Sequence, residues 1–138
     1  MARRRHLSRV AVLRVLFECE KRPSSDPLDA FERAKNDLRE EGDMDEEFAL
    51  QLLTGVISKK TEIENAMAIH APGWSLERMD PISRAVLRIG AYELLLAADA
   101  PPAVVMNEAI DIAKEYGTEE AGKFVNGVLN AIANKTKA

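Results

Sequence analysis

Apolar residues recur at intervals of three and four positions along almost the whole chain, and this spacing restricts the fold more than any other feature. Between Ser8 and Lys21, for example, Val10, Leu13 and Phe17 fall on one face of a helix. No stretch shows the two-residue alternation bounded by hairpin turns that is typical of a half-buried strand. The pattern predicts an all-α protein with six or seven helices packed as a bundle.

Proline, glycine and short polar residues mark where these helices begin and end. Asp26-Pro27 and Asp80-Pro81 each combine an N-cap residue with a proline at the first helical position. Ser8 is the expected N-cap of the first helix, and one long helix is expected from about residue 45 to residue 71. Breaks are expected near Pro23, Gly42, Gly73, Pro101 and Gly117.

The length of the chain suits one domain. We expect a single domain over residues 1–138, with a seam at Pro72-Gly73 between an N-terminal helical subdomain of about residues 1–72 and a C-terminal one of about residues 73–138. Leu87, Ile89, Tyr92 and Leu129 are expected in its core. Arg88 interrupts an apolar helix, so it needs an acidic partner, for which Glu93 and Glu108 are the candidates.

Composition argues against several classes of protein. Hydrophobic residues make up 46% of the chain and charged residues 30%, which is ordinary for a folded water-soluble domain. The single cysteine, Cys19, excludes an intrachain disulfide and a multi-cysteine metal site, and it is expected to be a small buried hydrophobe. No apolar run is long enough for a membrane span or has the form of a secretory signal. We therefore expect a cytoplasmic protein with no membrane association, metal or cofactor.

Charge is distributed unevenly along the chain. The net charge is −4, yet residues 1–22 hold seven basic and two acidic residues, whereas residues 26–47 hold ten acidic and three basic ones. Since phosphate groups respond to the local field, the acidic average does not argue against a nucleic-acid partner. The basic residues of the N-terminus therefore need an explanation of their own.

Arg3, Arg4, Arg5 and Arg9 form the clearest functional signal in the sequence. One interpretation is a solvated terminus with no specific role, because short basic runs are common. The other is an arginine-rich arm that binds RNA, because a guanidinium pairs with phosphate and stacks on unpaired bases.

The last predicted helix contains two poor helix formers, Asn126 and Gly127. We expect Gly127 to allow the close approach of a neighbouring helix. Lys123 and Asn126 are either ordinary surface residues or polar contacts to a ligand. The sequence shows no nucleophile elbow, phosphate-binding glycine loop or spacing of metal ligands, so no catalytic residue is expected.

Nine segments, spread over nearly the whole chain, form a recognisable set. They are Arg4-Arg5 through Ala11, Leu16-Phe17, Leu52-Leu53-Thr54-Gly55-Val56, Trp74-Ser75-Leu76-Glu77-Arg78, Ala85-Val86-Leu87-Arg88, Ala91-Tyr92-Glu93-Leu94, Asn107-Glu108-Ala109, Ala113-Lys114 and Lys123-Phe124-Val125-Asn126-Gly127-Val128-Leu129. In their order and spacing, these segments resemble the NusB family of bacterial transcription antitermination factors.

The resemblance implies an all-helical fold of two subdomains and binding to the boxA element of ribosomal RNA leader transcripts. It also implies a heterodimer with NusE, a small-subunit ribosomal protein, which joins RNA polymerase, NusA and NusG and suppresses premature termination. The residues that it places on RNA are Arg4, Arg5 and Arg9 at the N-terminus and Glu120, Lys123 and Phe124 in the last helix, to which the sequence adds Arg3 and Asn126. Phe17 and Glu77 are the implied contacts to NusE.

Three alternatives stay open at this point. A similar domain precedes the catalytic domain of ribosomal RNA cytosine methyltransferases, although 138 residues leave no room for a methyl-donor-binding fold, so we expect no enzyme. A purely structural helical adaptor without RNA contact is the second alternative, and the basic N-terminus counts against it. Some family members form homodimers that cover the RNA surface, and the sequence does not choose between a monomer and such a homodimer.

Overall fold

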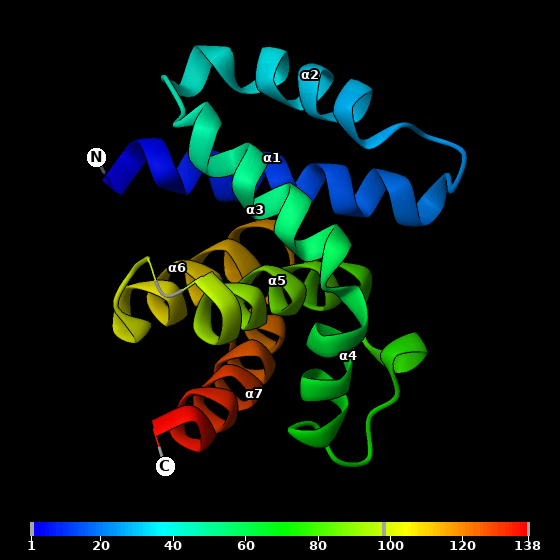
Figure 1. The fold of residues 1–138 in the computed structure, drawn as a ribbon, viewed down its shortest axis with the longest axis vertical. Coiled ribbons are helices and arrows are strands. Elements are labelled where there is room, and N and C mark those ends of the chain that lie inside the picture. Colours follow the sequence, from blue (N-terminus) through cyan, green and yellow to red (C-terminus); the bar gives the residue numbers. More distant parts are fainter. Residues whose placement is uncertain (1, 98, 138) are drawn as a thin grey trace. The chain divides into compact units, whose positions relative to one another are not determined.

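The structure, a computed structural model, describes residues 2–97 and 99–137. Over this part of the chain it contains seven α-helices and no strand, which confirms the predicted all-α class (Figure 1). The helices are α1 (Ala2–Lys21), α2 (Pro27–Leu38), α3 (Glu46–Ser58), α4 (Lys60–Ile69), α5 (Pro81–Tyr92), α6 (Pro102–Tyr116) and α7 (Glu119–Lys137). Two 3₁₀ segments, η1 (Arg39–Glu41) and η2 (Leu76–Arg78), and one π-helical segment, η3 (Glu93–Ala97), complete the elements.

The chain divides into two compact units, Met1–Thr54 (unit 1) and Gly55–Ala138 (unit 2), each of which has most of its contacts within itself. The division falls inside α3, whereas the expected seam at Pro72-Gly73 lies within unit 2. The physical reason is that α4, which precedes that seam, packs against α5, which follows it.

In unit 1, α1 and α2 lie side by side (Figure 1). The first helix begins at Ala2, so the prediction of an arm that precedes a helix start at Ser8 is wrong. Leu7 is almost fully buried and extends the apolar face of α1 toward the N-terminus. The side chains buried in this unit include Leu7, Val10, Leu13, Phe31 and Leu38.

Ser8 is an interior residue of α1 and is completely buried, so it is not an N-cap. Its hydroxyl contacts two backbone carbonyl oxygens, that of Arg4 at 3.0 Å and that of Asp45 at 2.7 Å. The second contact joins residues 37 positions apart, which local sequence patterns do not reveal. Ser8 therefore fastens the start of α3 to α1.

The two Asp-Pro signals cap helices as predicted. The Asp26 carboxylate accepts a hydrogen bond from the backbone N–H of Asp29 at 3.2 Å, and Asp80 accepts one from Ser83 at 2.9 Å. Each proline occupies the first turn of its helix, where a missing N–H costs nothing. All five predicted breaks fall between elements, which confirms them as helix boundaries.

The single long helix expected over residues 45–71 is interrupted at Lys59, so this prediction is wrong. The backbone of Lys59 departs from helical values, with φ −108° and ψ 23°. Hydrogen bonds nevertheless continue across it, from the Lys59 N–H to the Gly55 carbonyl and from the Ile63 N–H to the Lys59 carbonyl. The interruption is thus a local bend between α3 and α4.

In unit 2, α5, α6 and α7 pack on one another. Leu87, Ile89 and Leu129 are buried as predicted, but Tyr92 is only half-buried. Its ring occupies the space beside Gly55, where an added Cβ would come within 2.1 Å of the ring. The ring therefore packs against the backbone at Gly55, while the residue as a whole stays partly exposed.

Gly90 permits a close approach between α5 and α7, whereas Gly127 does not. A Cβ on Gly90 would lie 2.7 Å from the Leu129 side chain, whereas a Cβ on Gly127 would meet nothing within 4 Å. The packing role expected for Gly127 is therefore wrong. Arg88 bonds to the Glu64 carboxylate at 2.9 and 3.0 Å, a partner from α4 that its own neighbourhood in the sequence did not suggest.

Candidate nucleic-acid interface

Arg3, Arg4, Arg5 and Arg9, called the arginine cluster below, lie in the first two turns of α1. The four side chains differ in accessibility. Arg3 and Arg4 are exposed and Arg5 is half-buried, whereas Arg9 retains only 3% of its surface. In this conformation, the first three can reach a ligand in solvent and Arg9 cannot.

Phe48, in the first turn of α3, explains where Arg5 and Arg9 point. The guanidinium carbon of Arg5 lies 4.3 Å from the centre of the Phe48 ring, and that of Arg9 lies 5.0 Å from it. Cations at this distance are attracted to the negative face of an aromatic ring. Arg9 therefore holds α1 to the start of α3.

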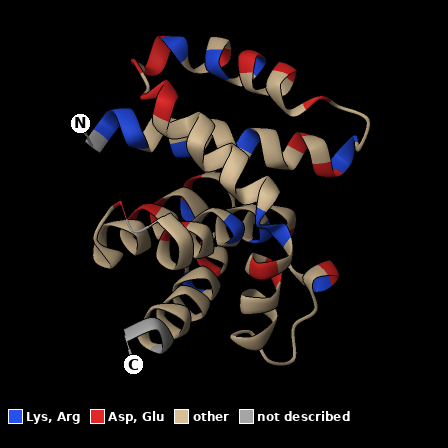
Figure 2. Ribbon diagram, viewed as in Figure 1, with Lys and Arg blue, Asp and Glu red and all other residues tan. Residues whose placement is uncertain are grey.

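Residues 40–47, called the acidic segment below, contact the arginine cluster directly. Six of these eight residues are Asp or Glu. Arg3 pairs with Glu41 at 3.5 Å and Arg5 pairs with Asp45 at 3.9 Å. Figure 2 shows the two charges in unit 1, with blue at the N-terminal end of α1 and red where α2 leads into α3.

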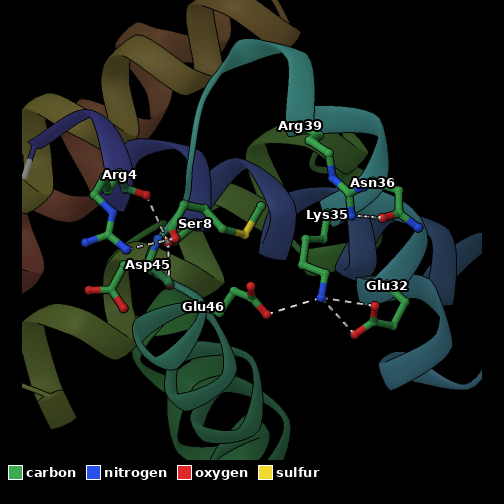
Figure 3. Close-up of polar contacts among 9 residues, drawn as sticks. Arg4, Ser8, Glu32, Lys35, Asn36, Arg39, Asp45 and Glu46 are labelled. Atoms are coloured by element: carbon green, nitrogen blue, oxygen red, sulfur yellow. Dashed lines mark hydrogen bonds and ion pairs between the residues drawn. The ribbon is translucent and has the colours of Figure 1, made fainter.

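Backbone groups reinforce the contact between these two segments (Figure 3). The Arg4 guanidinium donates a hydrogen bond to the Met44 carbonyl at 3.3 Å, and the Asp45 N–H donates one to the Arg4 carbonyl at 3.3 Å. The Asp45 carboxylate also caps α3 by accepting a hydrogen bond from the Phe48 N–H at 3.0 Å. The N-terminal arginines thus belong to the folded body of unit 1, which contradicts a simple solvated arm.

A hollow of about 300 Å³ lies beside this contact. Lys35, on its wall, donates hydrogen bonds to Glu32 and Glu46 at 3.2 Å each (Figure 3). These bonds stabilise the ammonium ion and raise the pKa of Lys35 above its ordinary value. The complete lining is Arg4, Lys35, Arg39, Gly42, Asp43, Met44 and Glu46.

In unit 2, the predicted residues of the last helix gather on the exposed side of α7. Glu120, Lys123 and Asn126 are exposed and Phe124 is half-buried. Lys123 and Glu120 approach to 3.7 Å, but their side chains are 73% and 85% exposed, so the pair is weak. The Lys123 ammonium therefore stays available to an anion.

Trp74 also belongs to this surface of unit 2, although it was not predicted from the sequence as an RNA-binding residue. Its ring lies 5.2 Å from that of Phe124 at an angle of 56°, and the Arg78 guanidinium lies 5.7 Å from its centre. Trp74 is nonetheless 46% exposed. Its position directly after Pro72-Gly73 was the available signal in the sequence, because turns and loops run over the protein surface. We call Trp74, Phe124 and Lys123 the aromatic surface.

The two residues implied as contacts to NusE lie in different units. Phe17 is half-buried on α1, with the Lys21 ammonium 5.0 Å above its ring. Glu77 is exposed in η2 of unit 2.

The described part of the chain contains no cluster of side chains suited to a metal centre. No group of three or more His, Cys, Asp or Glu side chains there could hold a metal ion. Cys19 is half-buried, and burial, followed by the negative charges of Glu18 and Asp26, raises the pKa of its thiol. A raised pKa disfavours the thiolate form, which opposes a role as nucleophile. None of the helices described is both long and apolar enough to cross a membrane.

Comparison with known proteins agrees with the resemblance seen in the sequence. The model of the NusB family matches residues 6–134. The chain belongs to the NusB family. The transcription antitermination protein NusB of Kineococcus radiotolerans is 39% identical over 133 residues, covering 96% of this chain and 94% of the relative. That of Nitratiruptor sp. is 38% identical over 139 residues, with the same coverage.

Solved structures of NusB proteins share the fold. NusB of T. maritima is 35% identical, with a TM-score of 0.82 over 94% of this chain and 90% of that one. A chain in a crystal structure of the antitermination factors NusB and NusE in complex with dsRNA is 29% identical, with a TM-score of 0.85 over 98% and 99%. The NusB match includes Arg9 and the aromatic surface, whereas Arg3, Arg4 and Arg5 precede it.

Proposed function

We propose that this protein binds the boxA element of ribosomal RNA leader transcripts together with NusE, and that the pair acts with RNA polymerase, NusA and NusG to suppress premature termination in the cytoplasm. The observation that carries the proposal is the likeness to the NusB structure solved with NusE and RNA, which extends over 98% of this chain. The two exposed surfaces described above supply the chemistry that such a role requires.

In unit 1, Arg3, Arg4 and Arg5 bind RNA phosphates. An arginine fork matches the geometry of phosphate oxygens, and its charge is permanent at physiological pH. Arg9 is part of the same surface but acts indirectly, since it is buried against Phe48. It keeps the first turns of α1 in place while the other three meet the RNA.

In unit 2, the aromatic surface binds unpaired bases. Trp74 offers an exposed ring that packs against the ring of Phe124, and bases of any kind stack on such rings. Lys123 supplies a cation for a nearby phosphate. Asn126 and Glu120 provide hydrogen-bonding groups for base edges, which give sequence preference beyond charge.

NusE binds to surfaces that include Phe17 and Glu77. A partly exposed aromatic ring and an exposed carboxylate suit the two kinds of contact found in protein interfaces, an apolar anchor and a polar rim. We expect a one-to-one heterodimer.

The experiment is to measure the binding of single-stranded boxA RNA and of a scrambled RNA of the same composition, each with and without NusE. We expect the protein to bind boxA RNA more tightly than scrambled RNA. NusE should increase the affinity for RNA further, and RNA should then increase the affinity for NusE by the same factor. Equal affinity for both RNAs with and without NusE would contradict the proposal and favour a structural adaptor. The mass of the free protein and of the mixture in solution tests the heterodimer against a homodimer that excludes RNA.

A further inference from the structure

The arginine cluster and the acidic segment of unit 1 carry opposite charges and lie more than 30 residues apart in the sequence, yet they contact each other. Among the cluster, Arg3 and Arg5 each have a carboxylate partner, Glu41 and Asp45. Both partners lie within the eight-residue acidic segment. Carboxylates thus occupy the positions that RNA phosphates need if the proposed function is correct.

These ion pairs are open to solvent. The side chains of Arg3 and Glu41 are 59% and 49% exposed, and those of Arg5 and Asp45 are 36% and 27% exposed. Exposed pairs of this kind are worth little, because water and salt screen them and long side chains lose entropy. A polyanion can therefore displace the carboxylates, but each displacement subtracts from the affinity of the RNA.

The acidic segment stays close to the arginines even when an ion pair opens. The Ser8 hydroxyl contacts the Asp45 carbonyl at 2.7 Å, and the Asp45 N–H donates to the Arg4 carbonyl at 3.3 Å. These bonds involve backbone atoms that RNA does not need. The effective concentration of the competing carboxylates beside the cluster therefore remains high.

We propose that Glu41 and Asp45 are internal competitors of RNA, which lower the affinity of the arginine cluster for RNA of any sequence. The inference rests on the proposed function and deepens it. Its consequence is that charge alone holds transcripts without boxA only weakly, and the contacts of unit 2 decide which RNA is retained.

The test uses the full-length protein and two probes, single-stranded boxA RNA and scrambled RNA of equal length. The variants are Glu41→Gln, Asp45→Asn and the two combined. Asn is as good an N-cap as Asp, so Asp45→Asn removes the charge and keeps the acceptor for the Phe48 N–H. Glu40→Gln is the matched control, because it removes one charge from the same segment at a residue for which no ion pair with the cluster is found among the described residues.

We expect Glu41→Gln and Asp45→Asn each to tighten the binding of both RNAs by about 1.5- to 5-fold beyond the control, which is the range for an exposed ion pair. The salt dependence should become steeper, since no freed carboxylate takes up cations. A gain no larger than that of Glu40→Gln, or weaker binding, would overturn the inference, the latter by showing that the acids position the arginines for RNA.

Two further measurements keep the outcomes separate. Thermal unfolding of each variant checks the fold, and Glu41→Gln retains the test if Asp45→Asn proves unstable, because Glu41 caps no helix in the described structure. Wild-type protein that binds neither RNA overturns the proposed function itself. Wild-type binding without a gain in the variants overturns only the role of Glu41 and Asp45.

Discussion

The two exposed surfaces of this protein are built by different means. In unit 1, the arginine cluster is held by ion pairs and backbone hydrogen bonds to the acidic segment. In unit 2, the aromatic surface lies on α7 and the turn before η2, and α7 packs on the apolar helix α5. Both units carry ten or so cations, but only unit 1 has three consecutive arginines in one turn, of which Arg3 and Arg4 are exposed and Arg5 is half-buried.

From this difference we infer separate tasks in RNA binding for the two surfaces. A charged surface that already carries its own counter-charges contributes affinity that depends on salt and not on sequence. An exposed aromatic ring beside hydrogen-bonding side chains contributes stacking and base recognition, which salt affects much less. The predictions below test this division, from the largest expected effect to the smallest.

The largest effect is expected from weakening the core of unit 2. Leu87 is fully buried in α5, and Leu87→Ala should lower the free energy of unfolding by about 2–5 kcal/mol, because it removes apolar contacts and leaves a cavity. Denaturant unfolding measures this change. A loss below about 1 kcal/mol would mean that Leu87 does not support unit 2.

A smaller loss of stability is expected where α5 meets α7. Gly90→Ala should cost about 1–3 kcal/mol, since the new Cβ would lie 2.7 Å from the buried Leu129 side chain. Gly127→Ala is the matched control on α7, where nothing lies within 4 Å of the new Cβ. There the better helix propensity of alanine should raise stability by up to about 1 kcal/mol. Denaturant unfolding measures both variants. Equal changes in the free energy of unfolding would mean that the close contact at Gly90 does not affect stability.

The aromatic surface itself is tested by Trp74→Ala. Loss of one stacked base should weaken the binding of single-stranded RNA by about 1–3 kcal/mol and leave the salt dependence unchanged. The turn that holds Trp74 is exposed, so the unfolding transition should move little. Titrations at two salt concentrations measure both quantities. Unaltered affinity would mean that Trp74 does not stack on a base of the RNA.

The sequence predicted the features that depend on neighbouring residues. Asp26-Pro27 and Asp80-Pro81 were found because a cap and its proline are adjacent in the chain. The all-helical class followed from spacing, and Lys123 and Phe124, which the resemblance implies as RNA contacts, both lie in α7, where Lys123 is exposed and Phe124 is half-buried. These features need no knowledge of how distant segments pack.

What the sequence did not predict depends on contacts between distant residues. The start of α1 at Ala2 and the burial of Ser8 depend on Asp45, which lies 37 residues after Ser8. The ion pair of Arg88 with Glu64 joins residues that are 24 positions apart. The pairing of Arg3 with Glu41 has the same origin. Local periodicity carries no information on such pairs, so the arginine cluster was expected to be an arm before a helix and proved to be part of one.

The proposed division, in which unit 1 supplies charge and unit 2 supplies recognition, is tested most directly by the salt dependence of RNA binding. The Arg4→Ala/Arg5→Ala double variant should weaken binding and flatten the plot of log affinity against log salt by roughly 1.4, the value for two lost phosphate contacts on single-stranded RNA. The factor should be the same for boxA and scrambled RNA. Since Arg4 and Arg5 bond to the Met44 carbonyl and to Asp45, thermal unfolding must accompany the titration, and a cost of about 1 kcal/mol or less per residue is expected. An unchanged slope in a folded double variant would contradict the claim and leave RNA binding to the aromatic surface alone.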